Sequence, residues 1–163
     1  MSLVNLFPVN ANNNYEGNKY AVYGFYPLLV MLLFRGLVHF LKEDAGLHDI
    51  ATIIPFPLID GIDANNVIYL FGSLWGASQI IILFLYLIIF FKYKNLLHFI
   101  WLTMILDVMF RLISGTIHPL TPEYYINQPP GSVANIYILI YSTLMFFLSI
   151  WKKNKIINYP NYY

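Results

Sequence analysis

The sequence contains no cysteine, and few of its residues are charged. Without cysteine, the 163-residue chain cannot form a disulfide scaffold, a cysteine nucleophile, a thiol redox site of the quinone-coupled kind, or a cysteine-based zinc or iron–sulfur site. Charged residues make up 10% of the chain, whereas soluble domains carry about 25%. The formal net charge is +1, which gives no electrostatic basis for binding nucleic acid. Such a composition excludes an ordinary water-soluble domain.

Long apolar runs dominate what is present. Apolar residues make up 59% of the chain, and the mean hydropathy is +0.62. A membrane-spanning helix needs roughly 20 mostly apolar residues, because the hydrocarbon layer is about 30 Å thick. Four segments meet this requirement: residues 20–41, 67–91, 96–113 and 133–151. We therefore predict an all-α fold, a four-helix transmembrane bundle with antiparallel up-down topology.

The flanking charges predict the orientation of the bundle. Lys92 and Lys94 occupy the second connection, and the C-terminal segment 152–163 is basic and rich in tyrosine. The first connection has one lysine against five acidic residues, a balance of 1 − 5 = −4. Because basic loops stay in the cytoplasm, we expect both termini there, in a multi-pass protein of the bacterial inner membrane. Residues 1–19 are polar and Asn-rich, and we expect a flexible tail.

Polar side chains within the spans gather in the outer half of the predicted bundle. Arg35 and His39 lie about 10 Å and 5 Å below the outer end of the first span, and Asp107 and Arg111 lie about 9 Å and 3 Å before the end of the third. Each pair has i,i+4 spacing and shares one helix face. Gln79 lies near mid-membrane in the second span. Asn135 lies at the outer start of the fourth span. The candidate ligand-binding set comprises Arg35, His39, Gln79, Asp107, Arg111 and Asn135.

Two interpretations of this set remain open. In the first, Arg35 and Asp107 form a salt bridge that locks the first span to the third, because an unpaired carboxylate in lipid is costly. We expect an Asp107 carboxylate oxygen within about 4 Å of the Arg35 or the Arg111 guanidinium. In the second, Arg35 and Arg111 hold an anionic or carbonyl group in a cavity that opens outward. The connections at residues 47–57 and 119–130 would cover that cavity, and Ser132 would cap the fourth helix.

The sequence predicts neither a metal site nor a cofactor. Its four histidines have no ligand-type spacing. A pigment or haem needs only one axial ligand, so His39 or His98 would suffice for either group. Gly72 and Gly76 form a GxxxG pattern, which favours close helix packing inside the bundle or, alternatively, a homodimer face. The bilayer is the predicted partner, with other membrane subunits as further candidates.

Several short motifs resemble those of a known group. They run from Asn66 to Gln79, from Arg111 to Gly115 followed by Pro119, and from Pro129 to Asn135. Together they resemble an uncharacterised family of bacterial four-helix membrane proteins that is loosely similar to the DoxX-like group. The resemblance implies a four-helix integral membrane protein with no assigned reaction. The residues that match its recurrent polar and turn positions are Gln79, Arg111, Pro129, Pro130, Gly131 and Asn135.

Two functions follow from these observations. The first is a small binding or accessory protein that holds a lipid-like or amphipathic ligand, or packs in a larger membrane complex. The alternative is a membrane enzyme acting on a lipid or quinone, with His39 or Asp107 as acid/base and Arg35 or Arg111 on an oxyanion. A transporter or channel is disfavoured, because the inner half of the spans has no polar relay.

Overall fold

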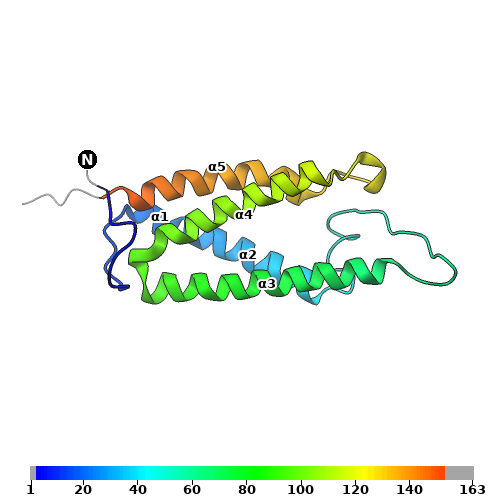
Figure 1. Cartoon of the computed structure of the whole chain (residues 1–163), viewed down its shortest axis with the longest axis horizontal. Coiled ribbons are helices and arrows are strands. Elements are labelled where there is room, and N and C mark those ends of the chain that lie inside the picture. Colours follow the sequence, from blue (N-terminus) through cyan, green and yellow to red (C-terminus); the bar gives the residue numbers. More distant parts are fainter. Residues whose placement is uncertain (1–2, 153–163) are drawn as a thin grey trace, which may run out of the picture.

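The computed structural model describes residues 3–152, which form a bundle of long helices (Figure 1). The helices are α1 (Lys19–Tyr23), α2 (Phe25–Leu41), α3 (Asn65–Lys92), α4 (Leu97–Ile117) and α5 (Pro130–Ile150). Two 3₁₀ turns, η1 (Lys94–Leu96) and η2 (Pro122–Tyr124), precede α4 and α5. With α1 and α2 counted as one span, four helical segments are long and apolar enough to cross a membrane. The predicted four-helix transmembrane fold is confirmed.

The helix ends differ from the predicted ones by a few residues. Helix α4 continues to Ile117, four residues beyond the expected end, and α5 begins at Pro130 rather than Val133. Proline suits the first turn of a helix, where its missing N–H would have no partner in any case. Ser132 is not the cap: its hydroxyl lies inside the first turn and donates to the Pro129 carbonyl at 2.7 Å.

The first span is interrupted at Gly24, between α1 and α2. Pro27 has no N–H to donate to the carbonyl of Tyr23, four residues earlier, and its ring crowds that carbonyl. The break also frees the Gly24 carbonyl, which accepts a hydrogen bond from the Tyr141 hydroxyl of α5 at 2.7 Å. A β-carbon at Gly24 would come within 2.9 Å of that same hydroxyl. The break thus allows α5 to approach the first span closely.

The bundle is built from two helix pairs that meet at one end. Helix α2 packs along α3, and α4 packs along α5. We call the part next to residues 3–18 and 92–97 the termini half, and the part next to residues 43–64 and 118–129 the loop half. Figure 1 shows the two pairs together in the termini half and diverging toward the loop half. Helices α3 and α4 therefore approach each other mainly near their short connection.

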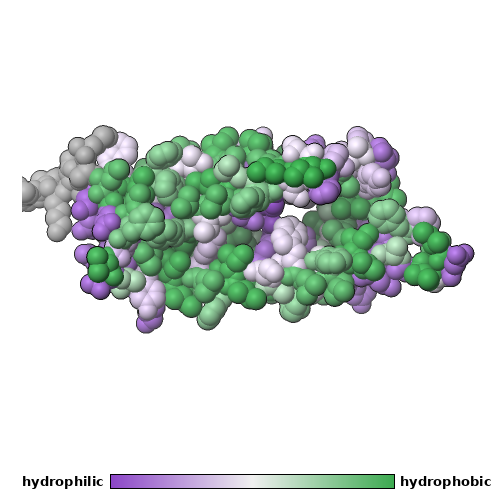
Figure 2. All heavy atoms as spheres, viewed as in Figure 1, coloured by the Kyte–Doolittle hydropathy of each residue, from purple (hydrophilic) through white to green (hydrophobic). Residues whose placement is uncertain are grey.

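The hydrophobic core lies in the termini half. Trp101 is fully buried and meets the Tyr141 ring edge-on, while Phe25 packs on Phe90 at 4.6 Å between ring centroids. The main buried cluster comprises Ala21, Phe25, Leu28, Leu32, Leu83, Tyr86, Phe90, Leu97, Ile100, Trp101 and Met104. Large apolar side chains cover much of the outer surface, as the green bands of Figure 2 show. That surface suits a hydrocarbon environment.

Residues 3–18, for which we predict a flexible tail, fold across the termini end of the bundle. The Leu6 carbonyl bonds His98 Nε2 at 2.8 Å, and Asn12 N donates to the Asn95 side chain at 2.9 Å. Glu16 pairs with Lys152 at 2.6 Å. Burial raises the pKa of the Tyr15 phenol, which stays neutral and donates to the Asn18 carbonyl. The predicted C-terminal tail lies outside the described residues, apart from Lys152.

The two long connections bind each other at the loop end. Ile54 N donates to the Tyr124 carbonyl, and Ile126 N donates to the Thr52 carbonyl, both at 2.9 Å. The Thr52 hydroxyl adds a bond to the Asn127 carbonyl at 2.7 Å. We call these contacts between residues 52–54 and 124–127 the loop clasp. It joins the α2–α3 pair to the α4–α5 pair at the end where the helices themselves diverge.

Candidate functional site: a cleft between the helix pairs

A cavity of about 240 Å³ lies where the two helix pairs begin to diverge, bordered by α2, α3 and α4. Its lining residues are Leu32, Arg35, Gln79, Ile82, Leu85, Tyr86, Thr103, Met104 and Asp107. In Figure 2, hydrophilic atoms are visible between the two apolar bands of the helix pairs. The cavity therefore brings three residues of the predicted set, Arg35, Gln79 and Asp107, to one place.

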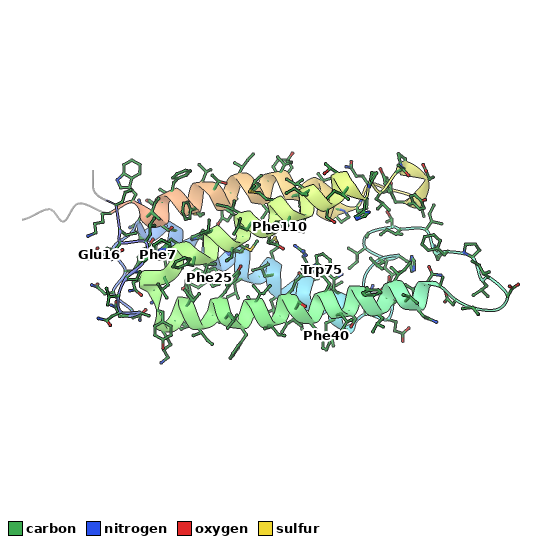
Figure 3. The ribbon with its side chains drawn as sticks, viewed as in Figure 1. Phe7, Glu16, Phe25, Phe40, Trp75 and Phe110 are labelled. Atoms are coloured by element: carbon green, nitrogen blue, oxygen red, sulfur yellow. The ribbon has the colours of Figure 1, made fainter. Side chains whose placement is uncertain are left out.

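Arg35 borders this cavity without an anionic partner. Its guanidinium carbon lies 4.6 Å from the centroid of the Trp75 ring, a cation–π contact. Among residues 3–152, no carboxylate lies within 4.0 Å of its nitrogens. Figure 3 shows Trp75 on the α4 side of α3, whereas Phe40 of α2 lies on the opposite side. Trp75 thus supports the arginine from one face and offers no negative charge.

Asp107 pairs within its own helix. Its carboxylate lies 2.8 Å from a terminal nitrogen of Arg111, one turn further along α4. The expected bridge between Arg35 and Asp107 is therefore absent from the described residues, and the first span is not locked to the third in this way. The i,i+4 geometry explains the difference, because the Arg111 partner needs no approach of a second helix. The pair satisfies Asp107 locally and leaves the charge of Arg35 uncompensated.

Two of the predicted side-chain amides are buried without partners. Neither amide atom of Gln79 has a hydrogen bond within the described structure, although both are shielded from solvent. The side-chain oxygen of Asn135 is in the same condition, but Asn135 does not line the cavity. A buried unpaired amide costs about 1–3 kcal/mol. Gln79 is therefore the member of this pair that could gain from a molecule in the cavity.

His39 lies outside the cavity, contrary to the expectation that it would share one with Arg35, Gln79 and Asp107. Its Nδ1 is 2.8 Å from the Ala45 carbonyl, and its ring packs on Trp75 at 4.6 Å between centroids. The first connection turns back over α2 at this point, which sequence periodicity does not reveal. His39 therefore orders the start of that connection.

The Asp44 carboxylate also orders the first connection. It accepts backbone bonds from Gly46 and His48 at 2.8 and 2.9 Å. Beside it, a hydrogen bond to the Asp49 carboxylate raises the pKa of Lys42. These bonds hold residues 42–49 in turns next to the end of α2, so the connection is an ordered part of the loop end.

Gly72 and Gly76 face α2 within the same chain. A β-carbon at Gly76 would lie 2.5 Å from the backbone nitrogen of Phe40, and one at Gly72 would lie 2.7 Å from the β-carbon of Ala45. The GxxxG pattern thus lets α2 and its following turn approach α3 closely, as the packing interpretation predicts. A homodimer through these glycines would require a face that the chain already covers.

His98 is buried under the N-terminal segment rather than placed at an open interface. It is 2% exposed, and its Nε2 is engaged by the Leu6 carbonyl. Within residues 3–152 there is no group of three or more histidine, aspartate or glutamate side chains arranged to hold a metal. A pigment or haem ligated through His98 Nε2 would first have to displace the Leu6 carbonyl.

Sequence reasoning missed Tyr86 and Thr103, which line the cavity. Their hydroxyls are 2.7 Å apart and connect α3 to α4. A signal for both residues was present in the spacing: Tyr86 follows Gln79 by seven residues, and Thr103 precedes Asp107 by four. Each is therefore on the same helix face as its predicted neighbour.

No protein-family model, curated protein or solved structure matches this chain. The resemblance to the DoxX-like group stays a prediction.

Proposed function

We propose that this small multi-pass membrane protein binds an amphipathic molecule in the cleft between its two helix pairs. Its role would be that of a binding or accessory subunit in the bacterial plasma membrane, with both termini in the cytoplasm. The observation that carries the proposal is Arg35, a cation within a membrane span that borders a cavity and has no carboxylate partner among the described residues. The bound head group would be an anion or a carbonyl.

Charge within the cleft supports an anionic or strongly polar occupant. Arg35, Asp107 and Arg111 sum to +1, since Asp107 is already paired with Arg111. An uncompensated arginine at this depth is costly in lipid, by about 2.5–3.5 kcal/mol on insertion scales. The shielded, unpaired amide of Gln79 is next to the same cavity and could add a donor and an acceptor by turning toward an occupant. An occupant that accepts hydrogen bonds would offset both costs.

The remaining walls support an apolar portion of the same molecule. Leu32, Ile82, Leu85 and Met104 provide hydrocarbon surface beside the polar groups. An apolar portion that enters from the bilayer leaves hydrocarbon rather than water, so these walls stabilise it through packing contacts and not through the hydrophobic effect. The combination of one cation, one amide and an apolar wall is typical of sites that bind amphipathic ligands.

The same geometry gives less support to an enzyme or a transporter. His39 does not line the cavity, and Asp107 is held by Arg111, so neither is placed as a free acid or base. Toward the termini half, the cleft ends against the packed core around Trp101 and Met104. A transported polar substrate would have to cross that core.

Native mass spectrometry after gentle extraction from the membrane tests the proposal. We expect wild-type protein to retain a small amphipathic molecule, and Arg35→Gln to lose it. Lys92→Gln is the matched control, because it removes an exposed cation at the termini end of α3. Equal retention by wild type and Arg35→Gln, or no adduct on either, would contradict the proposal.

A further inference from the structure

The net charge of the cleft selects a monoanion. With Asp107 paired to Arg111, a single negative charge brings Arg35, Asp107, Arg111 and the occupant to zero. A phosphate monoester carries about −1.5 to −2 at neutral pH and would leave excess negative charge. In a low-dielectric site, such an imbalance is expensive. The electrostatic match is therefore a singly charged head, such as a carboxylate or a phosphodiester.

The volume of the cavity favours the smaller of these two heads. At about 240 Å³ the cavity is below the range of about 300–1,000 Å³ that is typical of ligand pockets. A carboxylate with the first few methylenes of one alkyl chain is smaller than a phosphodiester with its glycerol and the start of two chains, and is therefore the better match. The cavity thus suits a single-chain amphipath whose chain continues beyond it.

The donors around the cavity also match a carboxylate. Because Trp75 covers one face of the Arg35 guanidinium, its edge remains free for ligand binding. That edge presents parallel N–H groups, which bind a carboxylate through two bonds. Gln79 also lines the cavity, and its amide nitrogen, which is shielded and unpaired in this conformation, supplies a third donor when the side chain turns toward the occupant. Arg35 comes from α2 and Gln79 from α3, so these donors belong to one helix pair.

The alkyl chain has a route out of the cavity. Helices α3 and α4 approach each other near their connection and diverge toward the loop half, while Leu85 and Ile82 line the α3 side. A chain leaving between these helices passes directly into the surrounding hydrocarbon. The route passes the Tyr86 and Thr103 hydroxyls, which bond each other across the gap, and then reaches the outside of α3, where Ile81, Phe84 and neighbouring side chains are apolar and exposed.

From these four observations we infer that the cleft binds a long-chain monocarboxylate, with its carboxylate on Arg35 and Gln79 and its alkyl chain leaving between α3 and α4. This inference rests on the proposed function and names the ligand class. The ligand would come from the bilayer, because most of its chain lies outside the cavity and in lipid.

Tryptophan fluorescence tests this inference on the full chain in phosphatidylcholine nanodiscs. The probe is 2-bromohexadecanoate, whose bromine is next to the carboxylate and would lie near Trp75. The chain has no cysteine for this reagent to alkylate. We expect saturable quenching in wild type, and apparent affinity at least about tenfold lower in Arg35→Gln, the scale of a charge-assisted hydrogen bond. Lys92→Gln should bind as wild type does.

Two further variants keep the test decisive if Arg35→Gln does not fold. Arg35→Lys retains the charge but loses the two parallel donors, and we expect several-fold weaker binding. Gln79→Leu should also weaken binding several-fold. A third variant, Trp75→Phe, is a control for the signal: it should remove the saturable quenching while radiolabelled hexadecanoate still binds. Unchanged affinity in both Arg35→Lys and Gln79→Leu would overturn the inference.

Four competitor ligands separate the inference from the proposed function. We expect hexadecanoate to displace the probe, and the methyl ester, phosphatidylglycerol and short-chain butanoate to fail at equal concentration. If the ester or phosphatidylglycerol competes as well as hexadecanoate and depends on Arg35, the cleft binds an amphipath of another class, and only the further inference fails. Equal competition by butanoate would remove the role of the alkyl chain. Binding that never depends on Arg35 would overturn both.

Discussion

The two halves of the bundle differ in how closely their helices pack and in which side chains lie between them. In the termini half, apolar side chains from α1 to α4 form a continuous buried cluster, and residues 3–18 cover its end. In the loop half, the helix pairs diverge, and the charged residues Arg35, Asp107 and Arg111 lie around or beside a cavity. One chain thus combines a closely packed support with a loosely packed cleft that holds charged residues. Stability and the proposed ligand binding can therefore be altered separately.

The largest expected effect concerns which half faces the outside. The charge of the connections predicts that the loop end does, so Ile62→Cys and Asn127→Cys should react with an impermeant maleimide in intact cells. Tyr93→Cys, at the exposed connection of α3 and α4, should react only after lysis. The chain has no native cysteine to give background labelling. Labelling of Tyr93→Cys in intact cells would reverse the assignment.

The next effect compares a side chain of the core with one on the surface. Trp101→Ala should lower the free energy of unfolding by about 3–5 kcal/mol, because it leaves a large cavity in the termini half. Phe110→Ala, nine residues further along α4, removes a ring that is 67% exposed and should change the free energy of unfolding far less. Unfolding in mixed micelles measures both variants. Similar losses would mean that the core is not confined to the termini half.

A smaller effect concerns the backbone contact that holds α2 on α3. Gly76→Ala should cost about 1–3 kcal/mol, since its β-carbon would meet the backbone of Phe40 and His39 at under 3.0 Å. Gly115→Ala is the control: its β-carbon meets nothing within 4 Å, and alanine favours helix by up to about 1 kcal/mol. The same unfolding assay applies. A neutral Gly76→Ala would show that α2 can move away from α3 at no cost.

The smallest effect concerns the Asp107–Arg111 pair. The Asp107 side chain is 43% exposed, so Asp107→Leu should cost only about 1–2 kcal/mol, less than a fully buried pair. The double variant Asp107→Leu with Arg111→Met should recover most of this loss. Arg35→Met is the control: it should change the stability by the same amount alone and together with Asp107→Leu, because the two residues are not paired. A non-additive effect of Arg35→Met and an additive effect of Arg111→Met would assign Asp107 to Arg35 instead.

The sequence predicted the spans well and the contacts between them poorly. Four apolar runs identify the helices, because hydrocarbon thickness requires a minimum length whatever the neighbours are. The partner of Asp107 depends on how far α2 and α4 diverge, and no residue pattern states that distance. His39 turned to the Ala45 carbonyl for a similar reason. Likewise, the bonds of Leu6 and Asn12 join residues more than 80 positions apart.

The loop clasp between residues 52–54 and 124–127 has a mechanical consequence. Two helix pairs joined at one end only could rotate apart about that end, with the largest movement at the free end. These pairs are joined at both ends, so while the clasp holds they can separate only by bowing apart in the middle. The gap between the pairs then opens sideways toward the bilayer, so it is more accessible to solutes dissolved in the bilayer than to solutes in water. In the binding role that we propose, occupancy of the cleft would follow the mole fraction of the ligand in the membrane, rather than its concentration in water.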